Sequence, residues 1–274
     1  MRIILSRKGF DASVGCVPSP ILEDGRFLSL PIPRPHGTYR YEELHPDGVG
    51  LGQVVHSLTK GRIGPHSRAH FDPDLDRSSA RRSPGWVPAF GQADAAASHL
   101  RRRGVVPGDI FLFFRWFRRA ERVGGRFNYV RGAEDLHVVF GWLRVGRIVE
   151  PAGGSVPRGL ERHPHFDGRP RRDNIVYVAK SPSDGGVFRH FDERLRLTAP
   201  GCSRSRWRLP GWLLPEGRTP LSYHANPKRW RRAGKWVYLD SVGRGQEFVL
   251  DTSEYPEAAG WVRRLLGCAS SDPP

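Results

Sequence analysis

The sequence predicts a β-rich α+β fold, either a mixed sheet or a partly closed barrel, with a few peripheral helices. Short apolar runs bounded by Gly and Pro dominate the chain, helical composition is clearest at 94–103, and no internal repeat appears. We expect a single domain over residues 1–268, with an N-terminal α/β part at 1–103 and a β-rich part at 104–268. The tail, 269–274, is expected to be disordered.

Seven segments have the composition of strands, because apolar, β-branched or aromatic residues either run together or alternate with polar ones. They are 1–5, 26–32, 110–117, 136–149, 174–179, 193–198 and 247–250. The segment 110–117 is an apolar aromatic run that is too short for a helix and suits the centre of a sheet. Gly141 and Gly146 predict a bend or bulge in the longest segment.

Three segments predict helices. The stretch 94–103 is rich in Ala, places cations in its last turn and ends before Gly104. A short helix is expected over 53–59, within a stretch, 34–65, that otherwise has the composition of a loop. The third helix, 255–266, carries apolar residues on one side.

A formal net charge of +16 and a pI near 10.7 are the strongest global features of this 274-residue chain. They predict a polyanionic partner, DNA or a nucleotide, because each phosphate paired with Lys or Arg releases counterions. The three cysteines, Cys16, Cys202 and Cys268, are far apart and form no CxxC pair. This spacing indicates neither a disulfide framework nor a cysteine zinc site.

Several signatures of enzymes and of exported proteins are missing from the sequence. It has no GxxxxGK[ST] loop, no GxGxxG after a strand, no GxSxG, no HExxH and no HxE…PCxxC. Nucleotide hydrolysis, dinucleotide redox chemistry and zinc deamination therefore lose support, and the cofactor stays unknown. Because residues 1–30 lack the pattern of a signal peptide and no apolar run approaches bilayer length, we expect a cytoplasmic protein without a membrane partner.

The first strand runs into a loop with a high density of hydrogen-bonding groups. Gly9 and Gly15 would let its backbone approach an anion closely, so we expect this loop to hold a phosphate. The residues expected to do so are Ser6, Arg7, Lys8 and Ser13, with Asp11 as a candidate acid or base. The alternative is an ordinary solvated surface loop.

Histidines and carboxylates cluster at two further places. His70 and Asp72 share one face of an extended segment, a spacing used for metal ligation or acid–base chemistry, although Asp72 also fits a turn in which it caps a helix. His163 and His165 flank a proline and could converge on a metal or a phosphate. Because no third ligand follows at a recognised spacing and arginines surround the pair, we predict a loop that faces nucleic acid and no metal site.

Two C-terminal segments, 203–210 and 228–232, interleave Arg with Trp, which would combine phosphate contacts with stacking on bases. The nucleic-acid-binding candidates are Arg204, Arg206, Trp207, Lys228, Arg229, Trp230 and Arg231. In the alternative, both tryptophans point inward and the arginines are solvated. Arg244 and Gln246 are further candidates for nucleotide contacts. Glu247 is a candidate general acid or base, unless it is an ordinary surface residue.

Residues 104–180 resemble the core of small barrels of the PUA, ASCH and EVE kind. The resemblance rests on Gly108-Asp109, on the aromatic strand that follows, and on a Gly-interrupted strand that ends in Val145-Gly146-Arg147-Ile148-Val149. It implies a partly closed PUA-like barrel with an aromatic pocket for a nucleotide or a flipped base. Alternatively, the aromatic side chains simply form the core of a sheet.

Blocks in order along nearly the whole chain resemble the nucleotide modification associated domain 3 family. They are Leu5-Ser6-Arg7-Lys8-Gly9-Phe10-Asp11, Pro18-Ser19-Pro20-Ile21, Leu28-Ser29-Leu30-Pro31-Ile32-Pro33, His70-x-Asp72-Pro73-Asp74-Leu75, Gly108-Asp109-Ile110-Phe111-Leu112-Phe113-Phe114 and Arg244-Gly245-Gln246-Glu247-Phe248. The resemblance implies a bacterial or phage protein of a system that modifies DNA bases, without defining a reaction. One departure is Arg115, which stands where the family pattern has a glycine.

We therefore expect an enzyme of a base-modification system whose catalytic groups are Asp11, His70, Asp72 and Glu247. The alternatives are a non-catalytic reader of modified bases and a subunit that bridges a modification enzyme to DNA. Other proteins of the modification system are the expected partners in the last case. Convergence of Lys8, Asp11, Asp72 and Glu247 on one cleft would favour the enzyme.

Overall fold

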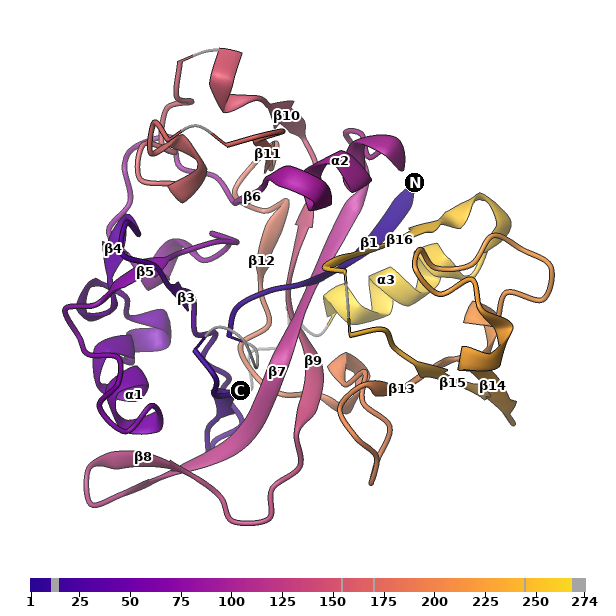
Figure 1. Cartoon of the computed structure of the whole chain (residues 1–274), viewed down its shortest axis with the longest axis horizontal. Coiled ribbons are helices and arrows are strands. Elements are labelled where there is room, and N and C mark those ends of the chain that lie inside the picture. Colours follow the sequence, from indigo (N-terminus) through magenta and orange to yellow (C-terminus); the bar gives the residue numbers. More distant parts are fainter. Residues whose placement is uncertain (11–14, 154, 170, 244, 268–274) are drawn as a thin grey trace.

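The computed structural model describes residues 1–10, 15–153, 155–169, 171–243 and 245–267, and it confirms a β-rich α+β fold (Figure 1). The strands form one sheet of seven strands and three sheets of three strands, all of them open within these ranges. The mixed-sheet form of the prediction is therefore confirmed, and the described residues do not close into a PUA-like barrel. None of the helices in these ranges has the length and apolarity to cross a membrane.

The seven-stranded sheet is organised around β7, a strand of 14 residues that runs through the middle of the molecule (Figure 1). The strand order is β12-β9-β7-β1-β16, with β2 and β8 paired to further parts of β7. β1 and β2 lie parallel to β7, and the other pairs are antiparallel. The strands are β1 (Arg2–Arg7), β2 (Ser19–Ile21), β7 (Ile110–Val123), β8 (Arg126–Tyr129), β9 (Leu136–Arg144), β12 (Gly185–Val187) and β16 (Glu247–Asp251).

Three small sheets and three α-helices surround this sheet. The small sheets have the orders β3-β5-β4, β10-β11-β6 and β13-β15-β14. Their strands are β3 (Ile32–Pro33), β4 (Tyr39–Arg40), β5 (Arg68–His70), β6 (Ala89–Gln92), β10 (Arg147–Val149), β11 (Ile175–Val178), β13 (Arg206–Pro210), β14 (Trp230–Ala233) and β15 (Trp236–Asp240). The helices are α1 (Leu51–Leu58), α2 (Asp94–Arg102) and α3 (Ala258–Leu266), each at a predicted position.

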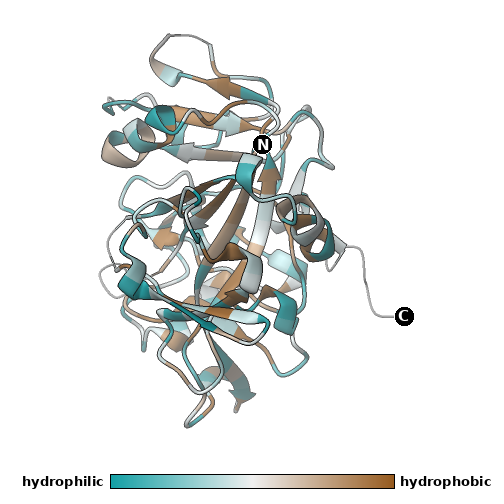
Figure 2. Cartoon of the chain, turned by 90° about the vertical axis from the view of Figure 1, so that its right-hand side faces the viewer, coloured by the Kyte–Doolittle hydropathy of each residue, from teal (hydrophilic) through white to brown (hydrophobic). Residues whose placement is uncertain are grey.

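β7 lies between two packed layers because its first half is apolar on both faces. On one face, Phe111 and Phe113 contact Phe90 of β6, with ring centroids 5.0 and 5.1 Å away. On the other face, the ring of Phe114 meets Trp207 of β13 edge to face at 5.0 Å. All five rings are fully buried, and Figure 2 shows the hydrophobic strands gathered inside the molecule. The large sheet therefore forms a firm base for the residues at its strand ends.

The predicted strand 136–149 is divided between two sheets, which the sequence analysis did not foresee. β9 stays in the seven-stranded sheet, and β10 crosses into the β10-β11-β6 sheet. Gly146 lies at this crossing, where an added Cβ would stand 2.4 Å from the backbone nitrogen of Lys180. A glycine is required there because the two backbones approach closely.

Two other predicted strands are mostly absent from the described structure. In 193–198, the Asp192 side chain accepts a hydrogen bond from the Arg194 N–H and caps a 3-10 turn over Glu193–Leu195. Such a local side-chain bond competes with strand pairing, which explains the wrong prediction. In 26–32, only isolated bridges of Arg26 and Phe27 and the start of β3 form.

Candidate functional site

A cleft of about 840 Å³ opens where the ends of several sheets meet the N-terminus of α2. Its walls come from segments that are far apart in the sequence, including the residues after β1, the end of β5, the end of β6 and the start of β16. Polar and charged side chains line much of it, among them Lys8, Arg34, His70, Asp72, Gln92, His165, Gln246 and Glu247. The sequence-based test for an enzyme, Lys8, Asp72 and Glu247 in one cleft, is met for the three residues that the structure describes.

Lys8 and Glu247 form a buried ion pair in this cleft. Antiparallel pairing of β1 with β16 sets Ser6 opposite Glu247, which brings Lys8 within reach. The Lys8 Nζ lies 2.8 Å from Glu247 Oε1, and their side chains are 8% and 1% exposed. The Gln92 amide donates a second hydrogen bond of 2.7 Å to the same oxygen. Glu247 Oε2, also buried, has no hydrogen-bond partner among the described residues.

The Lys8 ammonium also lies 4.1 Å from the ring centroid of Phe90, a cation–π contact on the core side. The contacts of Lys8 and Glu247 with each other, with the Gln92 amide and with the Phe90 ring hold both charged side chains in place. Pairing also offsets the cost of burying the two charges. Glu247 is therefore no ordinary surface residue, and its geometry leaves one carboxylate oxygen available to a ligand.

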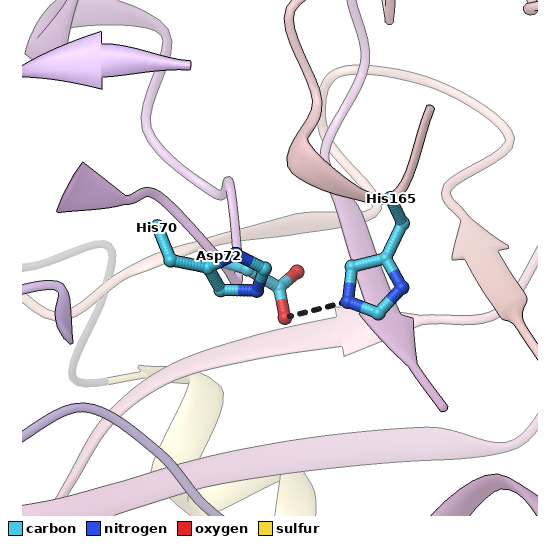
Figure 3. A group of neighbouring side chains, drawn as sticks. All are labelled: His70, Asp72 and His165. Carbon is cyan, nitrogen blue, oxygen red and sulfur yellow. Dashed lines mark ion pairs between the residues drawn. The ribbon is translucent and has the colours of Figure 1, made fainter. Parts of the chain in front are cut away.

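His70, Asp72 and His165 form a second cluster in the cleft, in which the three side chains point toward one another (Figure 3). Asp72 lies just beyond β5, and its Oδ1 accepts a 2.8 Å hydrogen bond from the Gly91 N–H of β6. His165 lies in a 3-10 turn over Pro164–Phe166. Its Nε2 is 4.0 Å from Asp72 Oδ2, and one nitrogen or oxygen from each of the three lies within 4.8 Å of the others.

The carboxylates of the 70–76 segment take three different roles. Asp72 does not cap a helix, since Asp76 accepts the capping hydrogen bond from the Ser78 N–H. Asp74 forms a buried ion pair with Arg82 at 2.6 Å, directed away from the cluster. Asp72 alone of the three lines the cleft.

In this cluster the Asp72 carboxylate is an anion, and the imidazoles of His70 and His165 are neutral. Burial lowers the pKa of His70 to about 3 and that of His165 to about 4, and both remain neutral near pH 7. Burial acts to raise the pKa of the Asp72 carboxyl, but the ring of His163, whose Nε2 lies 3.2 Å from Oδ1, and the neighbouring imidazoles outweigh it and hold the pKa below its usual value. The rim of the cleft is cationic, with Arg34, Arg169 and Arg171 in its walls.

The model of a protein family matches residues 2–251 of the chain, a span that includes every cleft residue described above. The chain belongs to the nucleotide modification associated domain 3 family. Membership associates this domain with nucleotide modification, which agrees with a cationic cleft that contains acid–base groups. A search of curated proteins found no match, and a search of solved structures found none.

Some of the residues predicted to hold a phosphate line the cleft of this family member, and others do not. Ser6 is fully buried in β1 and is not placed to contact a phosphate. Arg7 lines the cleft, but its guanidinium donates to the carbonyl oxygens of Val242 and Gly243, both at 2.8 Å, and so fixes the loop before β16. Gln246 lines the cleft. Asp11, Ser13 and Arg244 lie outside the described residues.

Arg115, which the sequence analysis noted as a departure from the family pattern, packs against Gly9 in the loop that follows β1. Its guanidinium is fully buried and donates to Leu30 O at 2.8 Å and to Ser19 Oγ at 3.2 Å. Burial lowers the pKa of Arg115 to about 9. Gly9 lies directly above it, where an added Cβ would stand 2.3 Å from the guanidinium carbon. The cleft loop thus rests on a buried cation.

The predicted stacking residues of the domain are core side chains. Trp207 is fully buried and donates its indole N–H to His137 Nδ1 at 3.0 Å. Trp230 is 9% exposed and donates to the carbonyl oxygen of His224 at 2.7 Å. Neither is placed to stack on a base, so the inward alternative is correct for both. The other candidates, which are at least partly exposed, are Arg204, Arg206, Lys228, Arg229 and Arg231.

Two other aromatic residues take the outward position on the β13-β15-β14 sheet. Trp236 and Tyr238 of β15 alternate with the buried Val237 and Leu239. The Arg208 guanidinium lies 4.8 Å from the ring of Trp236, and that of Arg231 lies 5.7 Å from the ring of Tyr238. The sequence analysis named Arg231 and the segment 203–210 of this Arg-aromatic face, defined by Arg208, Arg231, Trp236 and Tyr238, but it missed the two aromatic residues.

The sequence analysis also missed Gln92 and Arg34 as cleft residues. Gln92 is the last residue of β6 and precedes Asp94, the first residue of α2, by two positions. A polar residue between a strand and a helix start was the available signal, because ligands often bind at such junctions. Arg34 lies within the Pro-rich segment that was interpreted as a loop, and nothing in its local sequence sets it apart.

Proposed function

We propose that this domain is an enzyme that binds a nucleotide, free or within DNA, in the cleft and modifies its base. The observation that carries the proposal is the convergence of two polar clusters, Lys8 with Glu247 and His70 with Asp72 and His165, on one cleft with a cationic rim. Polar groups with shifted pKa values that converge on a cleft are the usual composition of an active site.

Different parts of the cleft would bind the phosphate and the base of a nucleotide. On the rim, Arg34 provides positive charge for a phosphate, and Arg169 and Arg171, which both pair with Asp167, add net positive charge. α2 begins at the same wall without a side-chain cap on its N–H groups. Gln92 Nε2 donates to Gln246 Oε1 at 3.2 Å and so orients the Gln246 amide, whose N–H groups would meet the edge of a base. Glu247 Oε2 is then the group that accepts a proton from the bound base.

Replacement of Glu247 by glutamine tests this proposal. The variant Glu247→Gln keeps the shape and the hydrogen-bonding capacity but loses the proton acceptor, so we expect about a hundredfold loss of base modification. The measurement is nucleoside mass spectrometry of DNA from cells that carry the complete modification system with either chain. Glu23→Gln, which changes an exposed carboxylate, should behave as wild type. A folded Glu247→Gln chain with undiminished modified nucleosides would refute the enzyme.

A second candidate function, DNA binding by a reader or bridging subunit, is favoured by the Arg-aromatic face. A groove of about 710 Å³ includes Arg208 and Trp236 and continues along Arg232 and Lys235. Cations that flank outward aromatic rings suit a single strand, whose bases stack and whose phosphates pair with Arg.

This second function predicts a defined loss of DNA affinity. Trp236→Ala should weaken the binding of a single-stranded oligonucleotide about tenfold, since stacking on one aromatic residue is worth about 1–3 kcal/mol. Fluorescence anisotropy at constant salt measures the change. Arg126→Ser, at the exposed tip of the β7–β8 hairpin, is the control and should have little effect. Equal affinities of Trp236→Ala and wild type would exclude the face as a docking surface.

A further inference from the structure

We propose that His70, Asp72 and His165 bind a divalent transition-metal ion in the cleft. Metal binding is measurable without knowledge of the reaction, and only the catalytic use of the ion rests on the proposed function. The proposal replaces the sequence-based expectation of no metal site, which weighed the 70–72 and 163–165 pairs separately. Folding brings the two pairs together (Figure 3).

The spacing of the side chains suits one shared ion. Asp72 Oδ2 and His165 Nε2 are 4.0 Å apart, which is too long for a hydrogen bond. Two ligand atoms that each lie about 2.1 Å from the same ion span up to about this distance. His70 completes the set, because its ligand nitrogen lies within 4.8 Å of both other ligand atoms.

The surroundings of His165 direct a lone pair toward Asp72. The Asn174 amide nitrogen donates to the backbone carbonyl of His165 at 2.9 Å, which fixes the orientation of the amide. Asn174 Oδ1 therefore faces His165 Nδ1 and accepts a hydrogen bond of 2.6 Å from its N–H. In this tautomer Nε2 is unprotonated. Metal-bound histidines are held in the same way, with the second ring nitrogen donating to a fixed acceptor.

Asp72 is oriented by a matching set of contacts. His163 Nδ1 accepts a hydrogen bond from the His165 N–H, so the proton of this ring is on Nε2, 3.2 Å from Asp72 Oδ1. The Gly91 N–H donates to Oδ1, and His163 Nε2 lies beside the same oxygen without forming a hydrogen bond, so Oδ2 is the oxygen that faces His165. A carboxylate oxygen and an imidazole lone pair that face each other repel unless a cation is shared between them. The geometry therefore points to a cation-binding position.

The donor set indicates the kind of ion. Two imidazole nitrogens and one carboxylate oxygen suit Zn²⁺, Co²⁺ or Fe²⁺ better than Mg²⁺ or Ca²⁺, which prefer oxygen ligands. Three protein ligands leave coordination positions open toward the cleft for water or for a substrate oxygen. The nearby Arg34 and Arg171 disfavour a bare cation but favour an ion whose remaining ligand is a phosphate or another anion.

Metal titration of the full chain tests the site directly. After dialysis against EDTA, isothermal titration with Zn²⁺ should show one ion per chain, and Co²⁺ should give visible absorption bands of a low-symmetry nitrogen–oxygen site. Asp72→Asn preserves the shape of the side chain, and this variant and His165→Ala should each weaken the affinity for Zn²⁺ by about a hundredfold. Asn174→Ala, which removes the acceptor of the His165 Nδ1–H and the donor to the His165 carbonyl, should weaken it by about tenfold.

Two controls make the outcome decisive. His56→Ala removes an exposed histidine and should leave the titration unchanged, as should Glu247→Gln, which lies in the same cleft but outside the cluster. The proposal is overturned if wild type binds no stoichiometric Zn²⁺ or Co²⁺, or if folded Asp72→Asn and His165→Ala bind as wild type does. Tight metal binding by a chain whose Glu247→Gln variant keeps full base modification would refute the proposed function alone.

Discussion

Replacing Trp207 by alanine should lower the free energy of unfolding by about 3–5 kcal/mol. The indole is fully buried between the large sheet and the β13-β15-β14 sheet, with ring centroids 5.0 Å from Phe114 and 6.0 Å from Phe248. Truncation removes this packing, leaves a cavity, and deprives the buried His137 Nδ1 of its donor. Urea unfolding followed by circular dichroism measures the change.

The matched control is Trp236→Ala. This tryptophan lies on the outer side of the neighbouring strand and is half-buried, so its loss should cost clearly less than that of Trp207. If Trp207→Ala unfolds at the same urea concentration as wild type, Trp207 does not belong to the core, and its stacking on nucleic acid has to be reconsidered.

Between pH 7.5 and pH 5, His137 and His224 together should lower the free energy of unfolding by about 4 kcal/mol, and the buried His70 and His165 should lower it further. His137 and His224 are buried and accept hydrogen bonds in their neutral forms, His137 from the Trp207 indole and His224 from the Val242 N–H. Burial lowers the pKa of His224 to about 4 and holds that of His137 well below 6.5.

The sign follows from which state takes up protons. Below pH 6.5 the unfolded chain binds a proton at each of these histidines, and the folded chain does not, so the unfolded state gains about 1.4 kcal/mol per pH unit for each histidine. This stability is present above pH 6.5 and is lost as the pH falls toward 4.

Urea midpoints at the two pH values give the measurement. His224→Gln should reduce the loss of stability between the two pH values by about 2 kcal/mol, the contribution of one buried histidine. The exposed His56→Gln should leave it unchanged. Equal stability of the wild type at pH 7.5 and pH 5 would contradict the prediction.

Local patterns were sufficient for the elements that carry the fold. The apolar run in 110–117 predicted the central strand because burial on both faces requires such a run. Lys8 and Glu247 were found for a related reason: each borders a buried strand, and charged residues at such positions line strand ends. The prediction stopped at 117 only because the hairpin with β8, not apolar residues, extends β7 to 123.

Contacts between residues far apart in the chain could not be predicted from the sequence. His70 and His165 each had an incomplete ligand set in their own segment, and no spacing rule joins the end of a strand to a distant 3-10 turn. Trp207 was a different kind of error. The alternation of Arg and apolar residues in β13 sets Trp207 opposite to Arg206 and Arg208, and solvation of the arginines requires that the indole be buried. The alternation in β13 therefore predicts a buried Trp207, but the sequence analysis named Trp207 as a stacking residue because it is adjacent to arginines.

The contact between Gly9 and Arg115 has an evolutionary consequence. Position 9 can carry a side chain only when position 115 gives up its bulk, since an added Cβ and the guanidinium would overlap. Relatives should therefore keep a glycine at 9 wherever position 115 carries a long side chain. Where position 115 is small, only residues that tolerate the positive φ of 77° can replace Gly9. Such covariation would trace how the loop that holds Lys8 acquired its present support.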